Sequence, residues 1–301
     1  MRVVRLGASL AGLLAALSAP AAAPALWDAL PAAPGASAAL SGAPAVPRAA
    51  TADPGRLARA AVAERPDVWA GARIVIGERS VVVGAARTGA AEAADLARRA
   101  DRAARVVARL AGPVRPLVLL PGTTAQAAAL AAPASVRGLA AVAAVDHVIV
   151  EPGAYARLSD AGRDVVLAHE LTHLATGAAT DARTPKWLME GFADYVGYLD
   201  SGIPAPAAAA ELAAEVRAGR RPIALPGPQA FAPESPRLAQ AYEEAWLACR
   251  YVVARYGERA LVALYREFSG GGAPGALPRV LGVSAERFTA AWRAYVVAEL
   301  S

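Results

Sequence analysis

The chain has 301 residues, of which 56% are hydrophobic and 19% charged, so it carries ample apolar material for a sizeable core. The formal net charge is +5, but the basic residues are almost all arginines scattered among alanines, which argues against a nucleic-acid partner. Cys249 is the only cysteine, so no disulfide can form within the chain, and we expect a buried, inert thiol.

The first 23 residues have the features of a signal peptide. Arg2 and Arg5 give a positive start, and an apolar run over residues 6–18 leads to small residues with a plausible cleavage site at 19–21. The run is short for a bilayer span, so we expect no stable membrane span after cleavage, with a retained signal anchor as the alternative. These features predict a secreted or cell-envelope protein.

Residues 24–66 are rich in alanine and proline and show little periodicity. This composition is typical of a disordered linker or a propeptide that does not form a packed core. Next come a predicted hairpin of two β-branched runs (73–77 and 80–84) and a long helix (90–110). They are followed by a buried strand (116–120), a short helix (125–131) and one continuous strand (140–150).

A second helix-rich part follows. One helix is expected to begin after a cap at Ser159 or Asp160 and to end at Gly177. The later predicted helices are 186–198, 204–217, 236–256, 258–268, 276–281 and 285–300. We therefore predict an α+β fold, in which a small mixed sheet and one key helix form a lobe over residues 67–200, followed by an all-helical lobe over residues 201–301.

The helix that ends at Gly177 carries an H-E-x-x-H motif, formed by His169, Glu170 and His173. The histidines are four residues apart, so their imidazoles share one helix face and can bind a single metal ion. Glu170 lies about 100° around the helix from His169, where it can reach a water molecule on that ion rather than the ion itself. This is the arrangement of a zinc hydrolase.

A catalytic zinc ion needs a third protein ligand. His147 is the only other histidine, and we expect it as a partly exposed residue of the strand over 140–150. Glu190 is the best candidate, because a short connection brings its helix back to the motif helix. Asp194, one turn further on, is placed to accept a hydrogen bond from a metal-bound histidine. Gly191 is expected to let these two helices approach closely.

H-E-L-T-H at residues 169–173, followed by W-L-M-E-G-F-A-D-Y at residues 187–195, resembles the gluzincin metallopeptidases. The likeness is closest to the peptidase-MA-like group of bacterial proteins and covers residues 73–300. It implies a zincin lobe with a helical lobe closing the cleft. It also implies one Zn²⁺ per chain and a role for each motif residue: ligands His169, His173 and Glu190, general base Glu170, and Asp194 as the residue that orients His169.

An oxyanion formed in such a reaction needs a further hydrogen-bond donor. No histidine follows His173, which leaves a tyrosine to be considered. Tyr242 opens the stretch Y-E-E-A-W, which is similar to the Y-E-x-G stretch of zinc aminopeptidases, where the tyrosine stabilises the oxyanion. The alternative is that Tyr242 is a core aromatic residue of an amphipathic helix.

Two departures argue against a typical aminopeptidase. The G-x-M-E-N motif by which the aminopeptidases recognise a free amino terminus is absent, since residues 138–142 read G-L-A-A-V. The interval from His173 to Glu190 is also shorter than the corresponding interval in those enzymes. We therefore predict an exported zinc metallopeptidase with a peptide or protein substrate. The alternatives are a non-catalytic envelope binding protein with a zincin fold and a zinc hydrolase of non-peptide amides. Neither oligomeric state nor cleavage preference follows from the sequence.

Overall fold

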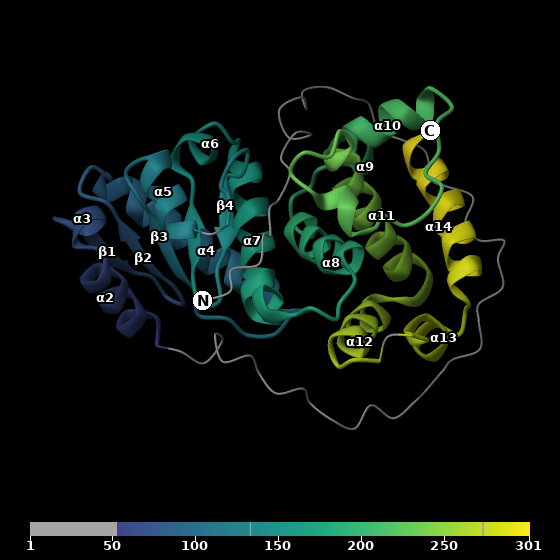
Figure 1. The fold of residues 1–301 in the computed structure, drawn as a ribbon, viewed down its shortest axis with the longest axis horizontal. Helices are drawn as coiled ribbons and strands as arrows, with labels where there is room; N and C mark the ends of the chain where they lie inside the picture. Colours follow the sequence, from purple (N-terminus) through teal and green to yellow (C-terminus); the bar gives the residue numbers. More distant parts are fainter. Residues whose placement is uncertain (1–52, 133, 273) are drawn as a thin grey trace.

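The computed structural model describes residues 53–301, except residues 133 and 273. The expected signal peptide, 1–23, and residues 24–52 of the expected linker lie outside the described residues. Figure 1 shows a β-sheet in one half of the molecule and helices in the other, with α7 (Asp160–Thr176) between them. The predicted α+β fold, a small mixed sheet followed by a helical remainder, is confirmed.

The first half alternates helices and short strands. Before α7 come α2 (Pro54–Glu64), α3 (Pro66–Trp69), β1 (Arg73–Ile76), β2 (Val81–Gly84), α4 (Ala90–Ala108), β3 (Leu117–Leu120), α5 (Thr124–Ala131), β4 (Ala141–Ala143), β5 (Val148–Val150) and α6 (Pro152–Ala156). After α7 come η2 (Ala178–Thr180), α8 (Lys186–Tyr198), α9 (Ala205–Ala208), α10 (Ala210–Arg217), η3 (Pro228–Phe231), α11 (Leu238–Tyr256), α12 (Glu258–Ser269), α13 (Ala276–Leu281) and α14 (Ala285–Leu300).

The sheet has the strand order β1-β2-β3-β5-β4. Its central pairs, β2 with β3 and β3 with β5, are parallel, while the outer pairs are antiparallel. The predicted hairpin of β1 and β2 is confirmed, with Arg73 opposite Gly84 and Ile76 opposite Val81. Strand β4 is therefore an edge strand, and it lies on the side of the sheet that leads to α7 (Figure 1).

The prediction of one continuous strand over residues 140–150 is wrong. The segment forms two antiparallel strands, β4 and β5, and the turn between them is closed by a hydrogen bond from the Ala144 N–H to the His147 carbonyl. His147 therefore lies in the turn, where its Nδ1 is 2.7 Å from Asp146 Oδ1. Apart from Asp146 and His147, all residues of 140–150 are apolar. The sequence pattern therefore contained no alternation of polar and apolar residues to show where β4 ends and β5 begins.

The prediction of a linker that continues to residue 66 is also wrong for its last part. Helix α2 begins after Asp53, whose side chain accepts a hydrogen bond from the Gly55 N–H, and Pro54 occupies its first turn. Ala58 is fully buried in a cluster that includes Trp69 and Leu119. The buried face of α2 consists mainly of small residues, which give a weak periodic signal.

Two hydrophobic clusters cover the two faces of the sheet. One face packs with α2, α3 and α5. The other contributes to a core that runs through α4, α7 and α8 to the C-terminal helices, with Val118, Leu167, Phe192 and Leu247 among its members. The predicted burial of Cys249 in this core is confirmed. Within the described ranges, no helix combines the length and apolar character needed to cross a membrane.

From α7 onward, the predicted helices occur in the predicted order, with one exception. The helix expected over 204–217 is divided at Ala209, whose backbone leaves the helical region, into α9 and α10. Helix α7 begins and ends as predicted: the Ser159 side chain accepts a hydrogen bond from the Gly162 N–H, and Gly177 adopts a left-handed conformation with φ of 67°. These two signals place the H-E-x-x-H motif in the second half of α7.

Candidate metal centre

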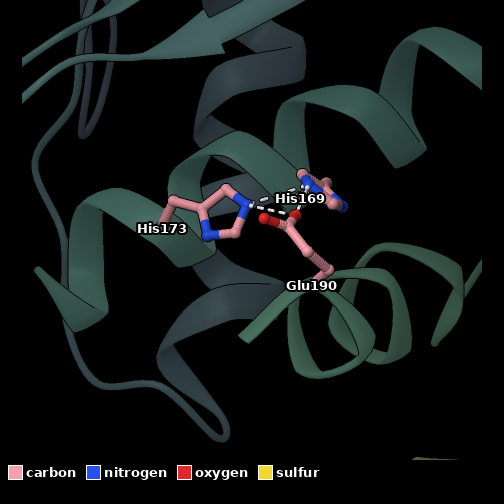
Figure 2. Close-up of side chains that lie close together, drawn as sticks. All are labelled: His169, His173 and Glu190. Atoms are coloured by element: carbon pink, nitrogen blue, oxygen red, sulfur yellow. Dashed lines mark hydrogen bonds and ion pairs between the residues drawn. The ribbon is translucent and has the colours of Figure 1, made fainter. Parts of the chain in front are cut away.

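Two successive helices bring three ligand-type side chains to one point. His169 and His173 lie on α7, and Glu190 lies on α8 (Figure 2). The Nε2 atoms of the two histidines are 2.9 Å apart, and Glu190 Oε2 is 3.2 Å from the Nε2 of His173 and 3.6 Å from that of His169. All three side chains are buried. The structure thus brings together the three residues that the sequence proposed as metal ligands.

Glycines allow close contact between the helices around this point, but not in the expected way. A Cβ atom added at Gly191 would lie 2.2 Å from the carbonyl oxygen of Ala245 on α11. The expectation that Gly191 lets α8 approach α7 is therefore wrong, because the backbone that it faces belongs to α11. Gly197 is the glycine that lets α8 approach α7, since a Cβ there would lie 2.9 Å from the carbonyl oxygen of Val165 on α7.

Asp194 lies one turn after Glu190 on α8 and contacts the motif helix. Its Oδ1 is 2.7 Å from Nδ1 of His169, in a buried hydrogen bond. An Nδ1–H donated to a carboxylate leaves Nε2 as the free lone-pair atom of the ring. Asp194 therefore holds the imidazole of His169 with Nε2 directed towards His173 and Glu190.

Glu170 is next to the three ligand-type residues but points elsewhere. Its Oε2 accepts a hydrogen bond of 2.7 Å from the backbone N–H of Ala143 on edge strand β4. Its Oε1 is buried, and none of the described residues forms a hydrogen bond with it. The contact with β4 was not anticipated from the sequence, because residues 140–150 were expected to form one strand. It leaves one oxygen of Glu170 available beside the cluster.

Burial and close contacts shift the pKa values in opposite directions. Burial lowers the pKa of His173 to about 4 and raises the pKa of Glu170 to about 8, because the charged forms lose their water. Burial also disfavours charged His169, but the Asp194 carboxylate outweighs it and holds the pKa of His169 well above its ordinary value. Burial is likewise outweighed at Glu190, whose pKa is held low mainly by His173. Such opposed shifts are typical of functional sites.

The donor set fits a zinc ion. Two imidazole nitrogens and one carboxylate oxygen are ordinary ligands of a catalytic site, which keeps a further position open. Tetrahedral bonds of about 2.0–2.1 Å separate neighbouring ligand atoms by about 3.3 Å. The separations of 2.9, 3.2 and 3.6 Å lie close to this value. Glu190 Oε2 is buried without a hydrogen-bond partner among residues 53–301 as far as the structure describes them, as expected of an oxygen that binds a cation.

Lys186 is a residue of the site that the sequence analysis missed. Its Nζ lies 3.2 Å from Glu190 Oε1, whereas the histidine Nε2 atoms pair with Oε2. Two signals could have found it: Lys186 is the only lysine in the chain, and it lies four residues before Glu190, on the same face of α8.

Tyr242 lies on α11 and is buried, with its ring 5.3 Å from that of Phe231 in an edge-to-face contact. It precedes Ala245 by three residues, so it is about one helical turn from the place where α11 meets α8. Its predicted role at the oxyanion stays a prediction. His147, in the turn between β4 and β5, is not part of the cluster of three.

The sequence matches the model of the Peptidase MA superfamily over residues 96–298. No curated protein matches it. Among solved structures it is similar to a mutant M1 zinc metallopeptidase from Deinococcus radiodurans, with 20% identity and a TM-score of 0.45 over 74% of this chain and 51% of that one. A two-domain M1 zinc metallopeptidase mutant bound to L-arginine is 18% identical, with a TM-score of 0.43 over 75% and 51%. The chain spans about half the length of these structures.

Proposed function

Because the chain belongs to the Peptidase MA superfamily, we propose that it is a zinc-dependent peptidase that cleaves peptide bonds in a peptide or protein substrate. The observation that carries the proposal is the convergence of His169, His173 and Glu190 on one buried point. A carboxylate with a free oxygen, that of Glu170, lies beside this point. Together they supply a metal site and a base, which are the two components that metal-assisted hydrolysis needs.

A zinc ion at this site would polarise the substrate carbonyl and lower the pKa of a bound water to about 7. Glu170 then acts as general base and takes the proton of the attacking water. The Ala143 N–H donates a hydrogen bond to Oε2 of this carboxylate, so Oε1 is the oxygen left to take the proton. Asp194 keeps His169 in the tautomer that a metal needs. Tyr242 is the proposed donor to the oxyanion.

We also propose that the protein is exported, on the sequence features of residues 1–23 alone. Determination of the amino-terminal residue of the protein in the envelope or medium tests this proposal. A new amino terminus near residue 22 supports cleavage of a signal peptide. A protein that stays in the cytoplasm with an intact first residue contradicts export.

Substitution of the base tests the proposed reaction. Glu170→Gln is expected to bind about one zinc ion per chain, as the wild type does, and to lose hydrolysis of a proteome-derived peptide library. Glu64→Gln, an exposed carboxylate on α2, is the matched control and keeps both properties. Full hydrolysis by Glu170→Gln would show that the mechanism is wrong.

The same library separates the alternatives. A wild-type protein that binds zinc but cleaves no peptide favours a binding protein with a zincin fold. A protein that leaves peptides intact and hydrolyses envelope polymers with non-peptide amide bonds favours the remaining alternative, a zinc hydrolase of non-peptide amides. Cleavage of the library at defined bonds supports the peptidase.

A further inference from the structure

We propose that Lys186 is a positioning residue of the metal centre: its ammonium group holds Oε1 of Glu190, so that only Oε2 is presented to a metal ion. This inference rests on the proposed zinc site. It adds to that site a residue which belongs to neither the H-E-x-x-H motif nor the E-x-x-x-D pattern.

The two oxygens of Glu190 have different neighbours. Oε2 faces the Nε2 atoms of the two histidines at 3.2 and 3.6 Å. Oε1 accepts a hydrogen bond from Nζ of Lys186 at 3.2 Å. A carboxylate can bind a metal through one oxygen or through both. A donor on Oε1 favours binding through Oε2 alone, which leaves room for substrate and water.

The Glu190 carboxylate is buried. The Glu190 side chain is 1% exposed, whereas that of Lys186 is 24% exposed. A buried carboxylate oxygen without a donor is costly, so Oε1 needs a partner that the metal ion does not supply. In the described part of the chain, Lys186 is the only lysine or arginine that forms an ion pair with Glu190. The other two partners are the histidines, which face Oε2.

Lys186 lies at the start of α8. It is the first residue of the helix and lies one turn before Glu190, so the two side chains share a face. Its Nζ also lies 3.7 Å from Sδ of Met189, a second contact that restricts the side chain. The ammonium group is therefore held by the same helix that carries the carboxylate, and it moves with Glu190.

The test uses cobalt in place of zinc, because the visible spectrum of Co²⁺ reports the number and arrangement of its ligands. We expect Lys186→Cys to change this spectrum and to lower kcat/KM by about 10- to 100-fold. Alkylation of the new thiol with bromoethylamine recreates an ammonium group at nearly the same length and should restore both. The native Cys249 is fully buried, so it is protected from the reagent.

Arg183→Cys, treated in the same way, is the matched control. It removes a positive charge from the exposed loop before α8, where the Arg183 guanidinium donates a hydrogen bond to the Ser269 carbonyl. Its spectrum and activity should match the wild type. Thermal unfolding of the metal-free proteins checks that each variant is folded, and Lys186→Gln serves as a second variant that removes the charge.

The outcomes distinguish the two proposals. A wild type that binds no cobalt overturns both. If the wild type binds cobalt, an unchanged spectrum in Lys186→Cys and Lys186→Gln overturns the role of Lys186 alone. If the wild type binds cobalt without hydrolysing peptides, the peptidase is wrong, and the spectra still decide whether Lys186 positions Glu190. A spectrum that is altered in both variants and restored by alkylation supports the inference.

Discussion

Gly191 and Ala245 bring the backbones of α8 and α11 into contact directly beside the metal centre. A Cβ atom at Gly191 would lie 2.2 Å from the Ala245 carbonyl oxygen and 2.5 Å from its carbonyl carbon. Both atoms belong to the main chain of a long buried helix, so neither can turn aside as a flexible side chain would. The position of Glu190, the preceding residue, therefore depends on the absence of a side chain at Gly191.

Gly191→Ala is expected to destabilise the protein by about 1–3 kcal/mol or more, because the two helices must move apart in a packed core. Thermal unfolding of the metal-free protein measures this change. Gly197→Ala should have a smaller effect, since its closest contact would be 2.9 Å. Gly227→Ala is the control, with open space around the added carbon and a negative φ. Equal stability of Gly191→Ala and wild type contradicts this account of the contact.

Asp194→Ala is expected to weaken zinc binding by about 10- to 100-fold, because His169 loses the acceptor that fixes its ring. Competition with a chelator of known affinity measures the dissociation constant. Asp200→Ala removes a neighbouring carboxylate that pairs with Arg109 on the surface, and it should leave zinc affinity unchanged. If both variants bind zinc equally well, the hydrogen bond to His169 has no role in metal binding.

Removal of zinc by a chelator is expected to abolish hydrolysis and to lower the thermal stability. An ion present at about 100 times its dissociation constant stabilises the folded state by about 2.7 kcal/mol. Zinc added back should restore the melting temperature of the wild type but not that of His173→Ala, which lacks a ligand. A melting temperature that zinc raises equally in both proteins would place the binding elsewhere.

Tyr242→Phe is expected to lower kcat by about 100- to 1,000-fold, the usual effect of losing one donor to an oxyanion. Zinc affinity should stay unchanged, because the hydroxyl is not a metal ligand. Tyr251→Phe, also on α11 but packed against Phe288, is the matched control. Unchanged kcat in Tyr242→Phe would identify the residue as a core aromatic.

Glu243 makes stability depend on pH. Burial, with Glu211 as neighbour, raises the pKa of Glu243 to about 9, although its carboxyl accepts hydrogen bonds from the backbone at the start of α10. The folded protein thus binds this proton more tightly than the unfolded chain, whose glutamate pKa is about 4.3. Stability should fall as pH rises from about 4.3 towards 9.

Glu243→Gln is expected to reduce this dependence, with a gain in melting temperature over the wild type that is larger at pH 8 than at pH 5. Glutamine keeps the shape and an oxygen that accepts from the Leu212 N–H. Glu234→Gln, in an exposed loop, is the control and should show the same pH dependence as the wild type. A parallel pH dependence in Glu243→Gln and wild type contradicts the raised pKa.

Predictions from local pattern succeeded where the physical cause is local. The cap at Ser159 and the left-handed glycine at Gly177 bound α7, because a side-chain oxygen and a missing Cβ act within one turn of the chain. The predictions from local pattern failed where one composition is compatible with several structures. Residues 140–150 are nearly all apolar and suit one strand or two, and small residues hid the buried face of α2 around Ala58.

The amino-acid sequence is enough to place His169 and His173 on one helix face, because their spacing matches one turn of a helix. It also proposed Glu190 and Asp194, through a pattern on the next helix. The contacts between atoms became known from the folded chain: Asp194 Oδ1 meets Nδ1 of His169, and the Ala143 N–H meets Glu170. These contacts depend on how α7, α8 and β4 pack together, and packing between distant segments is not encoded in the spacing of any one of them.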